Sequence, residues 1–270
     1  MNANKKQKGF TLVEIAIVLV IIGLLLGGVL KGQELINSAR VRNLADQSSG
    51  IQAAYYGFID RYRQIPGDML ATTACTTVGA AVDANCATTP TTGGSAAAGQ
   101  NGQNGRIDMW EEAGAVWPHL AVAGFLSGTY TGATSDPATY TAIASPPVVP
   151  GNAYQSPVFL GHTDDYDDAG GGGAIVRLAY TFGNAPASIL RELDVKLDDS
   201  LPGSGVVRAT LSTANTGEGS FTGTDDFGAA NGPVAWATGL GTTCVTGPDA
   251  AGATWNVDSN NTSCKGMFLY

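Results

Sequence analysis

A long uncharged stretch near the N-terminus constrains this chain more than any other feature. Residues Ile15–Leu30 carry no charged side chain and are mostly Ile, Val and Leu. Together with Phe10–Val13 they approach the ~20 apolar residues that a helix needs to cross the hydrocarbon core of a bilayer. Lys5, Lys6 and Lys8 precede the stretch, and basic residues favour the cytoplasmic side. The sequence therefore predicts one membrane-spanning helix, with the rest of the chain exported.

A secretory signal peptide is the main alternative for this stretch, because such peptides also join a basic end to an apolar segment. A signal peptide is normally cut at a small-x-small site just after its apolar region. Here the apolar residues run directly into the polar, helix-forming segment Lys31–Arg40, and no such site follows. A retained membrane anchor therefore fits the sequence better.

The composition argues against two classes of protein. The formal net charge is −9 and the pI is about 4.5. A protein that binds nucleic acid by neutralising phosphates needs a basic face, so we expect no nucleic-acid partner. The apolar residues gather at the N-terminus, and the remainder is rich in Gly, Thr, Ser and Ala. That uneven distribution disfavours a cytosolic housekeeping enzyme.

Glu14 is an exception within the apolar segment. An ionised carboxylate inside a bilayer costs several kcal/mol unless a cation lies beside it, and such residues are functional candidates by default. Cleavage of the Gly9–Phe10 bond would create a cation at the same depth, the α-amino group of Phe10. Glu14 and Phe10 are therefore candidate assembly residues.

A short motif surrounds that bond. Residues Lys8–Glu14 read Lys-Gly-Phe-Thr-Leu-Val-Glu and precede a long apolar helix. This pattern resembles the N-terminal motif of type IV pilins and type II secretion pseudopilins. The resemblance implies that residues 1–9 are a leader peptide, that a prepilin peptidase cuts between Gly9 and Phe10, and that Phe10 is then N-methylated. It also implies that Glu14 pairs with the amine of a neighbouring subunit.

The same resemblance implies the partners and the location of the protein. The expected partners are other pilin subunits, the prepilin peptidase, an inner-membrane assembly platform and membrane lipid. The expected location is the bacterial inner membrane for a single-pass precursor, followed by a periplasmic or cell-surface filament.

The segment after the membrane stretch carries one apolar stripe. Its positions recur at alternating spacings of three and four, as on one face of a helix: Val41, Leu44, Ser48, Ile51, Tyr55, Phe58, Tyr62 and Ile65. Pro66-Gly67 ends the pattern. We therefore expect one long helix, with residues 10–35 as its membrane and filament-core part and residues 36–65 as its amphipathic part. Residues 66–270 would form a globular periplasmic or extracellular domain.

Three further segments resemble a group of larger bacterial pilin-like proteins. They are Tyr62–Met69 with its Pro-Gly-Asp turn, Trp117–Leu126, and Leu193–Gly205. Ser200 stands where that group has glycine, so we expect an altered turn there.

The rest of the exported part is predicted from shorter patterns. Residues 72–104 are rich in Thr, Ala, Gly and Asn and indicate a surface loop, whereas residues 109–126 indicate a second helix. Strands are predicted over residues 174–182 and 205–211, with shorter ones at 157–160, 234–236 and 267–270. The expected fold is α+β: a long N-terminal helix packed on an antiparallel β-sheet with long loops, as in type IV pilins.

The four cysteines favour disulfide bonds. An even number of cysteines in an exported chain is typical of disulfides, because the periplasm is oxidising. Neither pair has the short spacing of a zinc knuckle. Of the three connectivities, the simplest joins sequence neighbours, Cys75 to Cys86 and Cys244 to Cys264. A C-terminal disulfide loop is also what the resemblance to type IV pilins implies.

One loop partly fits a calcium site, and calcium is the one cofactor we consider. Within residues 100–111, Asn104, Asp108 and Glu111 stand at positions that could supply oxygen ligands in an EF-hand-like loop. The first and third ligand positions lack carboxylates. A helix N-terminus capped by Asp108 is therefore a competing interpretation.

Enzyme signatures are absent from the sequence. His119 and His162 are the only histidines and neither lies near a cysteine; His119 falls on a predicted helix, where we expect a structural role. Gly203-Ser-Gly205 lacks the flanks of a nucleophile elbow. Gly170–Gly173 lacks the Lys-Ser/Thr ending of a phosphate loop. We expect a non-enzymatic protein.

These observations predict a structural subunit of a type IV pilus-like filament. Two alternatives stay open: a type II secretion pseudopilin, and a minor pilin that acts as a tip adhesin or priming subunit. The large loops favour a minor pilin. Many major pilins carry a proline midway in the membrane half of the helix. This chain has no proline there, and that absence favours a pseudopilin. Glycines, which lower helix stability, stand in this part of the helix instead: Gly23, Gly27, Gly28 and Gly32.

Overall fold

The computed structural model describes most of the helical and sheet-forming parts of the chain. The described residues are 12–83, 85–87, 103–107, 110–132, 147–163, 176–209, 244–246, 253–258 and 264–270. The chain divides into two compact units, residues 1–40 and residues 41–270.

The first unit consists of the apolar part of a long helix. Helix α1 runs over Leu12–Tyr62, and no proline interrupts that stretch of sequence. Within the first unit, all side chains of residues 12–31 are exposed. The uncharged sequence therefore forms the predicted helix, and the described residues of this unit form no core that would bury it.

The second half of α1 confirms the predicted stripe. The buried residues are Val41, Leu44, Ser48, Ile51, Ala54, Tyr55 and Phe58, and Tyr62 and Ile65 pack against the same core. After the helix, Arg63 adopts a left-handed φ of 56°, and its N–H still donates to the carbonyl of Ile59 at 2.8 Å. The Pro66-Gly67 turn follows, as the sequence predicts.

Among the described residues, the main sheet has four antiparallel strands in the order β1-β2-β6-β3. Their bounds are Val158–Thr163 for β1, Arg177–Ala185 for β2, Val207–Ala209 for β3 and Cys264–Leu269 for β6. A second, two-stranded sheet pairs β4, Val245–Thr246, with β5, Thr254–Trp255. The strands predicted near residues 157, 174, 205 and 267 are confirmed, whereas residues 234–236 lie outside the described residues.

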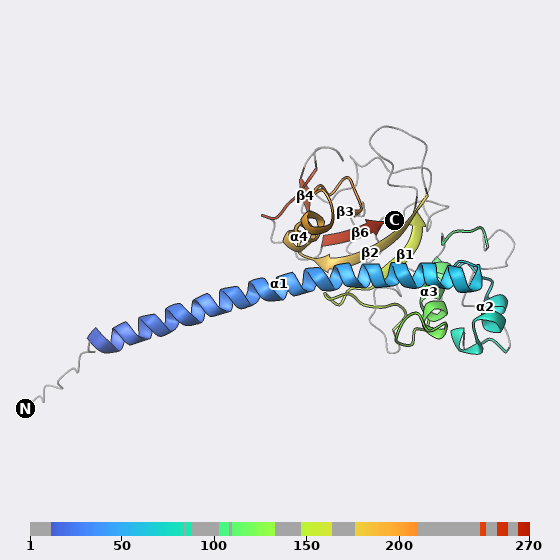
Figure 1. Ribbon diagram of the computed structural model, residues 1–270, viewed down its shortest axis with the longest axis horizontal. Coiled ribbons are helices and arrows are strands. Elements are labelled where there is room, and N and C mark those ends of the chain that lie inside the picture. The colour runs from blue at the N-terminus through green and yellow to red at the C-terminus, as the bar shows by residue number, and fades with distance from the viewer. Residues whose placement is uncertain are drawn as a thin grey trace, which may run out of the picture. The chain divides into compact units, whose positions relative to one another are not determined.

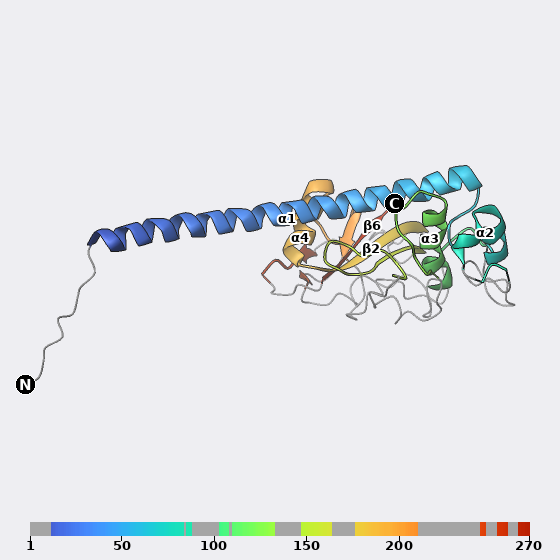
Figure 2. The same ribbon diagram turned by 90° about the horizontal axis from the view of Figure 1, so that it is seen from below.

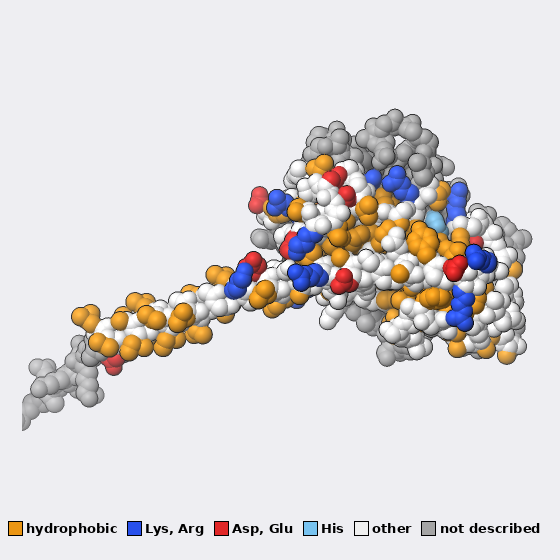
Figure 3. Space-filling view, viewed as in Figure 1, with side chains coloured by type: hydrophobic (Ala, Val, Ile, Leu, Met, Phe, Trp, Pro, Cys, Tyr) orange, Lys and Arg blue, Asp and Glu red, His pale blue; other side chains and the backbone are white. Residues whose placement is uncertain are grey.

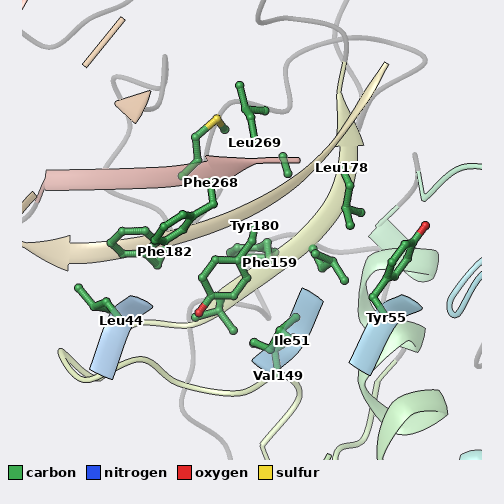
Figure 4. Close-up of a cluster of buried hydrophobic side chains, with 14 of the residues drawn as sticks. Leu44, Ile51, Tyr55, Val149, Phe159, Leu178, Tyr180, Phe182, Phe268 and Leu269 are labelled. Atoms are coloured by element: carbon green, nitrogen blue, oxygen red, sulfur yellow. The ribbon is translucent and has the colours of Figure 1, made fainter. Parts of the chain in front are cut away.

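The core of the second unit lies between α1 and the main sheet. In Figures 1 and 2 the second half of α1 follows one face of the sheet. Figure 4 shows Leu44 and Ile51 of α1 beside Tyr180 and Phe159 of the sheet, and all four side chains are buried. Burying a side chain of this size stabilises a fold by roughly 1.5–3 kcal/mol. The predicted α+β architecture is thus confirmed.

The described residues form three further α-helices, each of which adds residues to this unit's core or packs beside it. Helix α3, Trp110–Val122, confirms the predicted second helix. Part of the predicted loop at residues 72–104 is instead helical: α2 covers Ala71–Thr77, and a 3₁₀ turn covers Ala80–Val82. Helix α4, Ala187–Leu197, was not predicted, and it buries Ile189, Leu190 and Leu193. Both α2 and α4 are short, so tertiary contacts decide their structure more than local periodicity does.

Candidate functional site

The first unit presents an apolar helical surface to its surroundings. In the described part of the chain, α1 alone has the length and the composition to cross a membrane. Figure 3 shows apolar side chains along this part of α1, and Leu24 and Leu30 are 74% and 67% exposed. A Cβ added at Gly23 or Gly27 would have no neighbour within 4 Å. The described residues of the first unit therefore supply nothing that covers this surface.

Charged side chains bracket the apolar run. Glu14 lies in the first turn of α1 with an exposed side chain, and a carboxylate is favourable there because of the helix dipole. Lys31 follows the run and bonds to Glu34 at 2.7 Å. Gly9 and Phe10, the predicted processing residues, lie outside the described residues.

Both expected disulfides are present. Cys75 is bonded to Cys86, and Cys244 is bonded to Cys264. The second bridge fixes the first residue of β6 to the start of the small sheet. Each closed loop stabilises the fold by roughly 2–4 kcal/mol in the loop-closure model.

The Pro-Gly-Asp motif after α1 forms a turn that fits tightly against α3. Gly67 has a φ of +93°, and a Cβ there would overlap the carbonyl oxygen of Glu112. The N–H of Gly67 donates to Nδ1 of His119 at 3.0 Å. His119 is fully buried and stacks on Phe58, so the predicted structural role of this histidine is confirmed.

Asp68 of the same motif holds a distant loop. Its carboxylate oxygens accept the N–H of Asn104 at 3.1 Å and the N–H of Gly105 at 2.9 Å. The side-chain oxygen of Asn104 accepts the N–H of Arg106 at 2.9 Å. Glu111 lies in the first turn of α3, and Asp108 lies outside the described residues. Calcium binding at Asn104, Asp108 and Glu111 therefore stays a prediction.

Three carboxylates gather at the end of α4. Ligand oxygens of Asp194, Asp198 and Asp199 lie within 4.8 Å of one another, the one such group of potential metal ligands among the described residues. These oxygens already accept protein hydrogens: Asp194 from Trp255 Nε1 at 2.7 Å, Asp198 from the N–H of Val207 at 3.0 Å, and Asp199 from the N–H of Leu201 at 2.9 Å. The motif at residues 193–205 is thus a junction between α4, the following loop and the small sheet.

Asp194 has an unusual protonation equilibrium at this junction. Burial raises the pKa of Asp194 to about 6, hydrogen bonds from Trp255 and Ser200 oppose the rise, and the charges of Asp199 and Asp198 add to it. Ser200 has a φ of +69°, in the left-handed region that glycine adopts most readily. The serine therefore occupies a backbone position that would favour glycine.

His162 connects a loop to the main sheet, a role that the sequence did not indicate. Its Nδ1 accepts the N–H of Ile107 at 2.8 Å. Burial and the nearby charge of Arg106 lower the pKa of His162 to about 4. His162 and Ile107 are far apart in sequence, and no local pattern relates them.

The comparisons with known proteins concern the first unit. Residues 4–30 match the family model described as the prokaryotic N-terminal methylation motif. The N-terminus carries a prepilin-type motif. Comparisons with curated proteins and with solved structures gave no match.

The prepilin-type motif supports a type IV pilin-like or pseudopilin protein. Proteins with this motif are structural subunits that assemble with pilin subunits and are processed by prepilin peptidase. The motif and the exposed apolar helix together fit a membrane-anchored precursor.

Proposed function

We propose that this chain is a structural subunit of a type IV pilus-like filament. One observation carries the proposal: the prepilin-type motif at residues 4–30 leads into a helix whose apolar side chains are exposed. Such a surface needs lipid or other apolar helices around it, since large exposed apolar patches on a soluble protein mark interaction sites. A membrane-anchored precursor and a packed filament core supply these two environments in succession.

In this proposal, the first half of α1 drives assembly without covalent chemistry. Prepilin peptidase cuts between Gly9 and Phe10, and the new amine of Phe10 enters the filament with the helix. Glu14 of a neighbouring subunit compensates that amine in a core where water is scarce. Leaving one member of a buried ion pair alone costs about 3–5 kcal/mol, so the pair would set the register of each incoming subunit.

The processing step is tested by the N-terminus of the mature protein. We expect it to begin at Phe10, with an N-methyl group, and we expect Gly9→Leu to block cleavage. Intact-mass analysis and N-terminal sequencing of membrane fractions measure both outcomes. A mature protein that retains Met1, or that is cut after Leu30, would contradict the proposal.

The assembly step is tested by replacing Glu14 with leucine in cells that lack the wild-type copy. Glu14→Leu makes the segment more apolar, so insertion and cleavage should continue. Mature subunit should accumulate in the membrane with few or no filaments. Glu34→Leu is the matched control, because Glu34 lies on the same helix after the apolar run and should leave filaments intact. Normal filament number with Glu14→Leu would rule out the pairing role.

Labelling the chain with an antibody separates the proposal from its alternatives. Uniform labelling along surface filaments is the result expected for a major subunit. Label at the tips alone would indicate a minor pilin, and retention in the periplasm would indicate a pseudopilin.

A further inference from the structure

A short segment is attached to the edge of the main sheet through a histidine side chain. In the part of the chain that the structure describes, strand β1 lies at one edge of the four-stranded sheet. The backbone N–H of His162 in β1 donates to the carbonyl of Ile107 at 2.8 Å. In return, the N–H of Ile107 donates to Nδ1 of the His162 ring at 2.8 Å. This pair of bonds resembles a β-bridge in which a ring nitrogen takes the place of a carbonyl oxygen.

The attachment requires a neutral imidazole ring. A ring nitrogen can accept a hydrogen bond only while it carries no proton. The remaining ring proton is therefore on Nε2, which faces the hydroxyl of Tyr55 at 3.4 Å. The side chain of Ile107 is fully buried, so the attachment also holds an apolar contact in place.

The groups around His162 determine how the ring responds to acid. Arg106 faces it from the attached segment and disfavours a positive charge. Tyr55 faces it from α1, and the carboxylate of Asp68 acts on Tyr55 from the turn after α1. The residue opposite His162 in β2 is Leu178, which does not titrate. No carboxylate hydrogen-bonded to the ring is found among the described residues.

We propose that residues 103–107 form an acid-released latch on the outer edge of β1. A second proton on the ring would put an N–H at Nδ1, opposite the N–H of Ile107. Two donors cannot share that bond, so it would break. The Ile107 end of the latch would then be left with the single bond from the N–H of His162 to the carbonyl of Ile107, and it would open more readily and uncover β1 at His162. The other end would stay on Asp68, which accepts the N–H groups of Asn104 and Gly105. This device does not depend on filament assembly.

The direction and the size of the response follow from the two states of the ring. Burial lowers the pKa of His162 to about 4 in the closed state, and a released ring returns toward its ordinary value of about 6.5. The open state therefore binds the proton more readily, and its population rises as pH falls through the range between these values. By linkage, the population of the open state rises about tenfold between pH 7.5 and 5.5, and about 25-fold between pH 7.5 and 5.

Amide hydrogen exchange of the full chain in detergent micelles tests the latch. After correction for the intrinsic pH dependence of exchange, protection of the Ile107 amide should fall about tenfold between pH 7.5 and 5.5. The amides of Tyr180 and Phe268, paired within the sheet, should keep their protection. Unchanged protection of Ile107 over this range would overturn the proposal, and so would an equal loss at all three amides.

Two variants identify the group responsible. In His162→Gln the side-chain oxygen can still accept a hydrogen bond but does not titrate, so protection of Ile107 should no longer depend on pH. Arg106→Gln removes the neighbouring cation, so the pKa of His162 should rise and the loss of protection should be smaller. An NMR titration of His162 in the folded wild-type protein measures the pKa of the ring directly, and we expect a value well below 6.5. An ordinary pKa near 6.5 in that titration would overturn the latch.

Discussion

The two halves of α1 are both helical, but their apolar side chains have different surroundings. In the first unit, residues 12–31 are exposed on every side. In the second unit, Leu44 and Phe58 are fully buried in a core that the same unit provides. The glycines differ in the same way: Gly27 has open space around it, whereas a Cβ at Gly57 would lie 2.8 Å from the ring of Phe125.

The two halves of the helix are therefore stabilised by different interactions. The second half is stabilised by tertiary packing, as most helices in globular proteins are. The first half needs an apolar environment that the described residues of its own unit do not supply. A substitution in the second half should therefore change folding, whereas one in the first half should change insertion or assembly and leave the second unit intact.

The largest expected difference is between two truncations on α1. Phe58→Ala removes a fully buried ring that packs on Tyr62 and Phe125. It should lower the free energy of unfolding of the second unit by about 3–5 kcal/mol. Leu24→Ala is the matched control, because Leu24 is 74% exposed, and it should change that free energy by less than about 0.5 kcal/mol. Denaturant unfolding of the full chain in micelles, followed by near-ultraviolet circular dichroism, measures both. Equal effects would refute the comparison.

A smaller difference is expected between two glycine substitutions. Gly67→Ala places a Cβ at a φ of +93° and against the carbonyl of Glu112. It should destabilise the second unit by about 2–3 kcal/mol. Gly27→Ala meets no neighbour within 4 Å and should strengthen the helix by up to about 1 kcal/mol. The same unfolding measurement should show no loss of second-unit stability for Gly27→Ala; a comparable loss at both sites would be the contrary result.

A third test concerns the contribution of the polar junction at Asp194 to the stability of the second unit. Burial raises the pKa of Asp194 to about 6 from an unperturbed 3.8. The folded state thus prefers the protonated carboxyl, and the associated stability is lost as pH rises through about 6. Asp194→Asn removes this titration. The free energy of unfolding of the variant relative to wild type should increase by about 1–2 kcal/mol between pH 4.5 and 7.5.

Comparing the two proteins at each pH isolates this carboxyl, because the titration of His162 is common to both. Thermal melts at pH 4.5 and 7.5 provide the measurement. A difference that is constant with pH would show that Asp194 keeps an ordinary pKa.

The smallest expected effect comes from one substitution made in each unit. Ser200→Gly relieves a left-handed φ of +69° and should stabilise the second unit by about 1 kcal/mol. Ser38→Gly, within α1 of the first unit, should instead weaken the helix by roughly 0.5 kcal/mol. Its effect on unfolding of the second unit should be negligible. A stabilisation by Ser38→Gly, or none by Ser200→Gly, would contradict these assignments.

The features that could be predicted from the sequence are those with a long or strongly constrained local signal. The stripe from Val41 to Phe58 spans many turns, so its period identified the helix and its buried face. Local pairing identified both disulfides, because the loops that they close are short. The prepilin-type motif can be recognised from a short run of neighbouring residues, without any long-range contact.

The features that escaped prediction depend on contacts between distant parts of the chain. Helix α4 is short, and Asp194 within it is held by Trp255 from the small sheet. The ring of His162 bonds to Ile107, although nothing in either neighbourhood marks the pair. The sequence places Asp68 in a turn, but it does not indicate that the carboxylate of Asp68 accepts the N–H groups of Asn104 and Gly105.

The order of strands in the main sheet has a consequence for how the second unit forms. Strand β6 comes last of the four in the chain, yet it lies between β2 and β3. Until residues 264–269 have been synthesised, β3 lacks the partner that the described strands give it, and β2 lacks one of its two. Unpaired edges of this kind promote aggregation, and contacts between distant residues slow folding. A chain that lacks residues 264–269 should therefore aggregate more readily than one that contains them.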